Sequence, residues 1–431
     1  MIKAKNITGL RKILFATRMK AFLLFYYLPE ISKGRISVRR YILFLKRLLY
    51  FLSKIYPNKF VKIGNAVRLG LYIPRFPSQA FFTACRKFMV FDAKLPCTTV
   101  LISVTSACRF KCEHCYQRND LGKDADIDLT IAAAKQLKSL GISFFNIEGG
   151  EPFLVYDRLK KLCVAIGKDA EIWVNSTGDG MSIDRLRELK SLGLTAIMFS
   201  LHSYEPRKVN AFMKSDKAWD ILIEGIRLCH EADVPVTFNS CLLRDDFYNG
   251  NFQRVMDKAK EFNACLAQII KPKPSGGWLE SGVERFSEAD IVKVKDLVHM
   301  YNNDSQYKEY PSISAQIIEE DPAVFGCTAG GTDRFYINAK GDVQPCEFLN
   351  ISFGNIAHED FSKIYSRMRS FFEEPGECWL CEKYSPEILK SVKENNLKAL
   401  PLSEDLSKKI YSGWHRGKPT EIYKKIEKEL K

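Results

Sequence analysis

The residues with the clearest chemical potential are three cysteines within eight residues, Cys108, Cys112 and Cys115. They follow an apolar, strand-like run over residues 98–105. Thiolates are soft ligands that suit zinc and iron–sulfur clusters. A structural zinc site takes four protein ligands, and this stretch offers three thiols with no obvious fourth nearby. Three cysteines on a four-iron cluster leave one iron free, so we interpret the open iron as the place where chemistry occurs.

A second informative stretch comes about 35 residues later, where a strand-like run ends in Gly149, Gly150, Glu151 and Pro152. The CxxxCxxC spacing combined with this GGEP sequence resembles the radical S-adenosylmethionine (radical SAM) superfamily. The resemblance implies a 4Fe-4S cluster on the three cysteines that chelates SAM and cleaves it reductively to a 5′-deoxyadenosyl radical, which abstracts hydrogen from a substrate. It also implies that His114 faces the adenine, that the glycines let the backbone approach SAM, and that Glu151 receives the methionyl ammonium.

Strand-like and helix-like runs alternate between residues 97 and 272, as expected for βα units with a parallel sheet. Six strands are predicted, at residues 100–105, 143–147, 171–175, 195–201, 236–242 and 265–270. Six repeats are fewer than the eight of a closed barrel, and they agree with the partial (β/α)6 TIM-like barrel that the resemblance implies. We therefore predict an α/β fold with this barrel over residues 95–309.

Polar side chains at the carboxyl ends of these strands are candidates for the SAM site, because active residues of such barrels gather there. They are Asn175, Ser200, His202 and Arg244. The resemblance implies that Ser200 and Arg244 contact the ribose and carboxylate of SAM, whereas His202 stands where many relatives have Asp. His202 is also a candidate acid/base toward substrate, since imidazole titrates near neutrality. A purely structural role at a strand end is the alternative for each residue.

Four cysteines near the C-terminus form a second candidate metal site, Cys327, Cys346, Cys378 and Cys381. Residues 334–346 are typical of a β-hairpin, which would bring the first two together, and the CxxC pair supplies two more thiols. Four thiolates fit either structural zinc or a fully ligated iron–sulfur cluster.

The spacing of these cysteines resembles the SPASM and twitch modules of radical SAM enzymes, which carry auxiliary clusters. No cysteine follows Cys381, so the shorter twitch type fits better. The resemblance implies an auxiliary 4Fe-4S cluster that relays or accepts electrons, in a module of a β-hairpin and helices over residues 310–400. A basic helical tail at 401–431 carries no chemical motif.

The positive charge of the chain belongs to an N-terminal extension, residues 1–94, with 20 Lys/Arg and 2 Asp/Glu; the remainder has 45 basic and 49 acidic residues. Within it, residues 41–56 are apolar but too short and too charged to span a bilayer. The charges of this segment share one predicted helical face: Arg39, Arg40, Lys46, Arg47 and Lys54. This pattern predicts a helix on an anionic membrane surface, and a helix packed on the barrel is the alternative. Nucleic acid is not an expected partner, because the aromatic residues lie within apolar runs.

Thirteen unevenly spaced cysteines without a secretory signal indicate a reducing compartment. We therefore expect a cytoplasmic protein, peripheral on the inner face of the membrane. Its expected partners are SAM, an anionic membrane surface contacted through residues 1–60, and an electron donor such as flavodoxin or ferredoxin. For the substrate, a lipid or other membrane-held molecule and a ribosomal peptide both stay open. A non-catalytic zinc or iron–sulfur protein at the membrane is the alternative of a different class.

Overall fold

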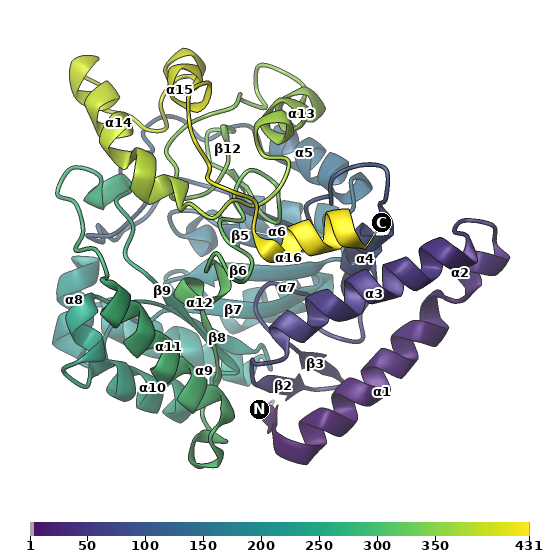
Figure 1. Cartoon of the computed structure of the whole chain (residues 1–431). Coiled ribbons are helices and arrows are strands. Elements are labelled where there is room, and N and C mark those ends of the chain that lie inside the picture. Colours follow the sequence, from purple (N-terminus) through teal and green to yellow (C-terminus); the bar gives the residue numbers. More distant parts are fainter. Residues whose placement is uncertain (1–3, 431) are drawn as a thin grey trace.

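A nine-stranded sheet lies at the centre of the molecule, in the order β10-β9-β8-β7-β6-β5-β4-β11-β12. The computed structural model describes residues 4–430 (Figure 1). Six of its strands are those predicted: β4 (Thr99–Ser103), β5 (Phe144–Glu148), β6 (Glu171–Ser176), β7 (Leu194–Ser200), β8 (Val236–Cys241) and β9 (Leu266–Ile270). Each pairs in parallel with the next. The partial barrel of the α/β class is therefore confirmed.

Helices connect successive barrel strands and pack on the outside of the sheet (Figure 1). They are α5 (Ile127–Ser139), α6 (Tyr156–Ile166), α7 (Ile183–Leu192), α8 (Pro206–Met213), α9 (Ala218–Glu231) and α10 (Asn251–Glu261). Their ends follow local chemistry, as α7 shows. Ser182 caps its first turn by accepting a hydrogen bond from the Arg185 amide, and Gly193 ends it at a φ of 118° that favours glycine.

The barrel contains one more parallel strand than the sequence predicted. Strand β10 (Ser312–Ala315) follows α11 (Glu288–Asn303) and pairs in parallel with β9. The predicted module boundary at residue 310 therefore falls inside the last βα unit of the barrel. The strand was missed because it is four residues long, directly follows Pro311 and contains one large apolar residue, Ile313.

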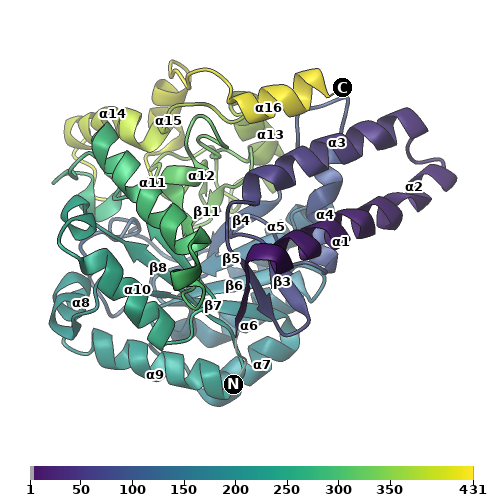
Figure 2. The same ribbon diagram turned by 60° about the horizontal axis from the view of Figure 1, so that its bottom comes forward.

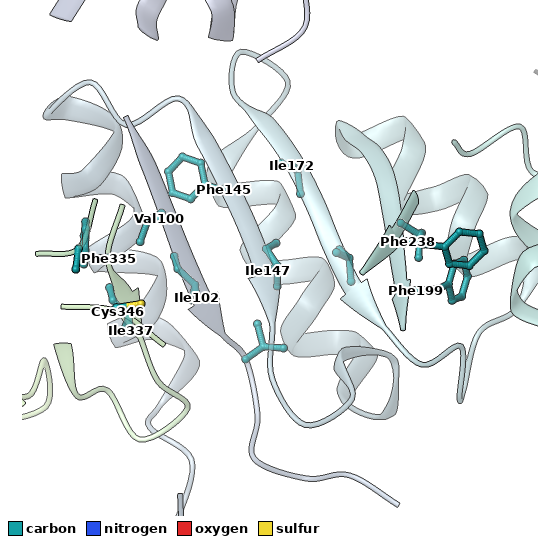
Figure 3. Packing of buried hydrophobic residues seen from close by; sticks show 14 of the residues in the cluster. Val100, Ile102, Phe145, Ile147, Ile172, Phe199, Phe238, Phe335, Ile337 and Cys346 are labelled. Atoms are coloured by element: carbon teal, nitrogen blue, oxygen red, sulfur yellow. The ribbon is translucent and has the colours of Figure 1, made fainter. Parts of the chain in front are cut away.

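The predicted C-terminal hairpin is present and extends the barrel sheet. Strands β11 (Tyr336–Ile337) and β12 (Val343–Gln344) pair antiparallel, and β11 also pairs in parallel with β4. Figure 3 shows Phe335, Ile337 and Cys346 beside Val100 and Ile102 of β4. Four short helices accompany the hairpin: α12 (Gln316–Glu319), α13 (Phe361–Phe371), α14 (Leu380–Glu394) and α15 (Glu404–Tyr411). The four-cysteine region thus shares one sheet and one core with the barrel.

The N-terminal extension forms a helical hairpin and a small antiparallel sheet. The sheet consists of β1 (Lys5–Ile7), β2 (Phe60–Ile63) and β3 (Ala66–Arg68). The helices are α1 (Gly9–Tyr27), α2 (Pro29–Ser32), α3 (Val38–Ile55) and α4 (Gln79–Cys85). Both views show α1 and α3 running side by side away from the barrel, with α2 at their far end (Figures 1 and 2).

Helix α3 is the amphipathic helix predicted for the membrane surface, but its apolar face is buried inside the protein. It packs against Phe325 and against Ile422 and Ile426 of the C-terminal segment, which forms α16 (Glu421–Lys424) and a π-helical turn. Arg47, predicted on the wet face, is 1% exposed and donates hydrogen bonds to the carbonyls of Val90 (2.6 Å) and Leu430 (2.8 Å). Helix α3 is therefore packed within the protein, but its partners are the extension and the C-terminal segment and not the barrel core.

No helix within residues 4–430 combines the length and the apolar character that crossing a bilayer requires.

Candidate functional site

The three-cysteine loop leaves the carboxyl end of β4 and is held by backbone hydrogen bonds on two sides. The amide of Glu113 donates to the Phe212 carbonyl (3.2 Å), and the Gly277 amide donates to the Cys115 carbonyl (2.9 Å). The thiol of Cys108 is exposed, and those of Cys112 and Cys115 are half-buried. Burial raises the pKa of Cys112 to about 12, with Cys115 and Cys108 adding to the shift because their thiols are close. A bound metal would therefore be needed to keep these groups as thiolates at neutral pH.

The GGEP segment is clamped onto the stretch that leads into the cysteine loop. The Gly150 amide donates to the Thr105 carbonyl (2.7 Å), and the Glu151 amide donates to the Ala107 carbonyl (2.8 Å). A Cβ atom on Gly149 would lie 2.6 Å from the Thr105 carbonyl oxygen, and one on Gly150 would lie 2.2 Å from that of Ala107. The glycines thus permit a close approach to the protein's own chain, whereas the sequence pointed only to an approach to SAM.

The Glu151 side chain is fully buried and is already occupied by protein donors. Its carboxylate accepts hydrogen bonds from the Phe153 amide (3.0 Å), the Ser176 hydroxyl (2.8 Å), and the amide and hydroxyl of Thr177 (2.7 and 2.6 Å). Burial raises the pKa of Glu151 to about 7, and these hydrogen bonds act against the shift. Four donors use the four lone-pair sites of a carboxylate. Glu151 therefore ties the GGEP segment, which continues through buried Pro152, to the end of β6, and an ammonium would have to displace one donor.

Buried polar atoms without partners gather at the ends of the neighbouring strands. Asn175 Nδ2 donates to Glu148 Oε2 (2.9 Å), which leaves Asn175 Oδ1 and Glu148 Oε1 unpaired, and Asn239 Oδ1 and Ser240 Oγ are also unpaired. Burial raises the pKa of Glu148 to about 8. Orphaned buried polar atoms are rare and normally have a bound partner. These atoms therefore fit a polar ligand such as SAM. The sequence analysis did not identify Glu148 as a candidate, because its position is typical of the last residue of a strand.

His114 and His202 pack together in an aromatic cluster beside the loop. The ring of His114 stacks on Phe212 (centroids 4.7 Å apart, interplanar angle 25°) and meets His202 edge-on (4.5 Å). Burial lowers the pKa of His114 to about 4 and that of His202 well below its ordinary value. The Cys241 amide donates to His202 Nδ1 (3.1 Å), so the neutral ring carries its proton on unpaired Nε2. His202 is therefore a neutral hydrogen-bond donor, and the proposed role as an acid that titrates near neutrality is not supported.

The other two predicted SAM ligands differ in placement. Ser200 is half-buried at the end of β7, in register with Asn239 of β8, and so belongs to the group of strand-end side chains. Arg244 instead forms ion pairs with Asp290 (3.1 Å) and Glu284 (3.4 Å), and its side chain is 40% exposed. Its guanidinium is therefore paired with carboxylates of the protein, and the predicted contact with the SAM carboxylate would require these ion pairs to open.

Three of the four C-terminal cysteines come together, although the set spans 55 residues of sequence. Cys327, Cys346 and Cys381 line one small internal cavity. Cys378 lies next to it and borders an open cavity of about 570 Å³, and its amide donates to the carbonyl of Arg416 in the tail (3.3 Å). The hairpin brings Cys346 to this position, as predicted, whereas the contribution of the tail was not foreseen.

The spacing of the thiols bears on which metal each site fits. Among residues 4–430, no three Cys, His, Asp or Glu side chains converge closely enough to share a single metal ion. A zinc ion draws all of its sulfur ligands to about 2.3 Å, whereas each cysteine of an iron–sulfur cluster binds its own iron. A polynuclear cluster therefore tolerates thiols that lie farther apart than the ligands of a zinc ion.

Two protein-family models match this chain. That of the radical SAM superfamily covers residues 102–250, and that of the SPASM domain, an iron–sulfur cluster-binding domain, covers residues 327–398. The chain belongs to the radical SAM superfamily. This radical SAM enzyme accordingly uses a 4Fe-4S cluster and SAM, and its SPASM module implies auxiliary iron–sulfur chemistry. The cysteine count favours the twitch type, but the match is to SPASM, with four cysteines for one complete coordination sphere.

Relatives of this radical SAM enzyme include proteins with different named activities. The AdoMet-dependent heme synthase of Nitratidesulfovibrio vulgaris is 21% identical over 68% of this chain and 86% of the relative. The PqqA peptide cyclase of Streptomyces rochei is 23% identical over 66% and 79%. The structure of Streptococcus suis SuiB bound to S-adenosylmethionine has a TM-score of 0.54 at 16% identity, covering 68% and 72%, and supports the fold. The non-catalytic alternative is wrong, because members of this superfamily are enzymes.

Proposed function

We propose that Cys108, Cys112 and Cys115 hold the SAM-binding 4Fe-4S cluster, and that the four C-terminal cysteines hold an auxiliary one. The observation that carries this proposal is a loop of three neighbouring thiols at the carboxyl end of β4, next to unpaired polar atoms of β5, β6 and β8. When bound, the SAM cluster supplies the 5′-deoxyadenosyl radical that removes a hydrogen atom from substrate, and the auxiliary cluster supplies a site for one electron.

The side chains around the loop orient SAM and substrate and exclude water. Glu148 and Asn175 offer a free acceptor each, and His202 offers a free N–H. Phe212 and Trp278 pack around His114 and cover it on two sides. Because these groups are already fixed by hydrogen bonds and packing, little reorganisation is needed when the ligand binds.

A buried network supports communication between the two proposed cluster sites. Gln117, two residues after Cys115, donates hydrogen bonds to the hydroxyl groups of Tyr116 (3.1 Å) and Tyr336 (2.9 Å). Tyr336 belongs to β11, the strand that leads into the hairpin ending at Cys346. Buried side chains thus connect the segment after Cys115 to β11, and we infer that electrons pass between the two sites through protein, without access of water to a substrate radical.

Replacing Cys108, Cys112 and Cys115 together by alanine tests the ligand assignment. The variant should form no 5′-deoxyadenosine from SAM under strong reduction, yet retain about four irons on the C-terminal site. Cys163→Ala is the control, because this thiol is buried in the core of α6, far along the chain from either set. Anaerobic product analysis and iron and sulfide determination provide the measurement. Retained SAM cleavage in the triple variant would show that the sites are assigned wrongly.

We further infer that the substrate is a lipid or another membrane-held molecule, because the outer face of α1 fits an anionic bilayer. Helix α1 buries one stripe, ending in Leu23 and Tyr27, and exposes apolar side chains on the opposite side, with Leu10 70% and Phe25 66% exposed. The exposed set also includes Ile13, Leu14, Phe22, Leu24 and Leu28. A contiguous apolar surface of this kind marks an interaction site.

The basic residues next to the exposed apolar face of α1 favour an anionic partner. Arg11, Arg18 and Lys20 of α1 are exposed, and no acidic residue precedes Glu30. Each basic residue near an anionic leaflet contributes roughly 1 kcal/mol, and the apolar side chains can insert at the interface. We therefore assign the membrane contact to α1 and not to α3, because the apolar face of α3 is covered by the protein.

Flotation with vesicles that contain phosphatidylglycerol tests this surface. The intact protein should float at low salt, and the combined Leu10→Ser, Leu14→Ser and Phe25→Ser changes should weaken binding at least about tenfold. Val164→Ser with Val292→Ser is the matched control, because these side chains on α6 and α11 are 57% and 56% exposed and lie outside the extension. An intact protein that stays unbound to these vesicles at low salt would contradict the inference.

A peptide substrate is the second candidate, favoured by the names of two similar proteins. One relative is a PqqA peptide cyclase, and SuiB, with a TM-score of 0.53, has been crystallised with its precursor peptide. Incubation of the enzyme with SAM, a reductant and either lipid or peptide extracts, followed by mass spectrometry, separates the two. A mass change confined to peptides would favour the maturase.

A further inference from the structure

Three cationic side chains from separate parts of the chain surround the four cysteines of the proposed auxiliary site. Lys273 belongs to the linker after β9, Arg334 precedes β11, and Arg416 belongs to the C-terminal tail. None is part of the cysteine pattern or of the proposed SAM site. Each lies beside a different thiol, so their common feature is the metal site.

Lys273 places positive charge next to the CxxC pair. It is 4% exposed, and its Nζ lies 2.9 Å from Glu382 Oε1 and 3.6 Å from the centre of the Trp379 ring. Lys271 pairs with the same carboxylate at 3.0 Å. Two ammonium groups share one carboxylate, which leaves one positive charge in excess. Burial raises the pKa of Cys381 to about 12, and the neighbouring Lys273 acts in the opposite direction.

Arg334 lies on the hairpin side of the site, where its guanidinium faces two carboxylates. Its Nη2 is 3.9 Å from Cys346 Sγ. Its other groups pair with Glu320 (2.5 Å) and approach Glu347 (3.7 Å). Arg334 therefore adds a donor beside one thiol, but two carboxylates face its single positive charge, and Glu347 Oε2 also lies 2.9 Å from Cys346 Sγ. This group carries one net negative charge.

Arg416 has buried N–H groups that nothing else in the described chain uses. Its Nε and Nη2 are buried and lack hydrogen-bond partners, and no described carboxylate lies within ion-pair distance. Its guanidinium stacks over Phe372 at 4.4 Å. Burial lowers the pKa of Arg416 to about 10, and the closeness of Cys327 acts against this shift. A buried cation with free donors is costly unless an anionic partner satisfies it.

The tail that carries Arg416 is built against the CxxC pair. The Cys378 amide donates to the Arg416 carbonyl (3.3 Å), and the Glu377 amide donates to the Lys418 carbonyl (3.0 Å). Gly417 has a φ of 77°, and a Cβ atom there would lie 2.8 Å from Cys378 Sγ. Only glycine permits this approach, so the backbone from Arg416 to Lys418 is held against the CxxC pair.

We propose that Lys273 and Arg416 raise the reduction potential of the auxiliary cluster, which rests on the assignment of the four cysteines made above. One-electron reduction adds one negative charge to a cluster that already carries four thiolates, and no proton needs to move. Net charge around a cluster and hydrogen bonds to its sulfur atoms set its potential. The excess ammonium charge and the unpaired guanidinium together outweigh the one excess carboxylate beside Arg334. The remaining positive charge stabilises the reduced form, so the cluster is suited to accept an electron.

The test is a redox titration of the auxiliary cluster, followed by electron paramagnetic resonance, in the Cys108, Cys112 and Cys115 alanine background. Only the auxiliary cluster is then present, and dithionite supplies the electron. Lys273→Met and Arg416→Met should each lower the equilibrium constant for reduction about tenfold, a midpoint about 59 mV more negative. Arg416→Lys, which retains the charge, should fall between Arg416→Met and the parent. Lys390→Met is the control, since this side chain of α14 is 73% exposed.

Two outcomes decide the proposal. Midpoints of Lys273→Met and Arg416→Met equal to that of the parent, with iron content preserved, would overturn it. Should Arg416→Met lose its iron, Lys273→Met decides alone by the same criterion. A background protein without any cluster would instead refute the ligand assignment itself, and production of 5′-deoxyadenosine by the unmodified enzyme is unaffected by either result.

Discussion

The two cysteine sites of this enzyme lie on the same sheet but in opposite electrostatic surroundings. Near the three-cysteine loop the cations are at the surface, with the side chains of Arg109 and Lys214 71% and 49% exposed. The buried groups there are carboxyls and neutral imidazoles. Around the four-cysteine site, Lys273 and Arg334 are buried at 4% and 6% exposure, beside the buried carboxylates Glu320 and Glu347.

This difference follows from what each proposed cluster has to hold. SAM carries a sulfonium and an ammonium, so buried lysines near the first site would repel it, whereas carboxyls and neutral donors accommodate it. A cluster with four thiolates carries net negative charge and gains from nearby cations. The surroundings of a cluster therefore indicate whether it binds a cationic ligand in addition to exchanging electrons.

The largest effect should come from breaking the backbone clamp at the first site. In Gly150→Ala the new Cβ would lie 2.2 Å from the Ala107 carbonyl oxygen, and backbone atoms cannot move aside cheaply. We expect the cysteine loop to shift and 5′-deoxyadenosine formation to fall by about a hundredfold or more, while the auxiliary site keeps its iron. Gly413→Ala is the control, because nothing lies within 4 Å of its Cβ position. Activity within about threefold of the parent would contradict the role of the clamp.

An intermediate effect should come from removing the carboxylate that the two buried lysines share. Glu382→Ala leaves Lys271 and Lys273 without their partner, and breaking a buried ion pair in this way costs about 3–5 kcal/mol of unfolding free energy. Glu113→Ala, at the first site, is the comparison, since its pair with Lys214 is half exposed. That change should cost at most about 1 kcal/mol. If chemical denaturation shows that the two variants lose equal unfolding free energy, the two sites do not differ as expected.

The smallest effect concerns how stability depends on pH at the first site. Burial raises the pKa of Glu148 from 4.5 to about 8, so between these values the folded protein keeps a proton that the unfolded chain releases. The unfolding free energy should therefore decrease as pH rises through this window. Glu148→Gln should remove about 1.4 kcal/mol of that decrease per pH unit within the window.

Denaturation of the parent and of Glu148→Gln at several pH values checks this prediction. For Glu382 the dependence of stability on pH should have the opposite sign. Burial alone would raise the pKa of Glu382, but Lys273 and Lys271 lower it. Its stabilising contribution is present above the ordinary glutamate pKa and is lost as pH falls below it. A stability difference between the parent and Glu148→Gln that does not change with pH would show that Glu148 is not held in its neutral form.

Features that depend on short-range spacing could be predicted from the sequence. Three cysteines within eight residues, the GGEP segment and six alternating strand and helix runs are local patterns, and the structure contains the strands where they were predicted. The four-cysteine pattern also indicated a hairpin, which is present as β11 and β12. Such features are predictable because the residues that cause them are neighbours in the chain.

Only the tertiary structure decided which amphipathic faces and which charged side chains are covered. Helices α1 and α3 both carry basic and apolar residues, but α3 is covered by segments near residues 325 and 426, whereas the outer face of α1 is left exposed. Arg47 is buried by a carbonyl 383 residues away, and Arg416 reaches Cys378 through a tail without any motif. The burial of a long cationic side chain depends on distant partners, and no local pattern contains that information.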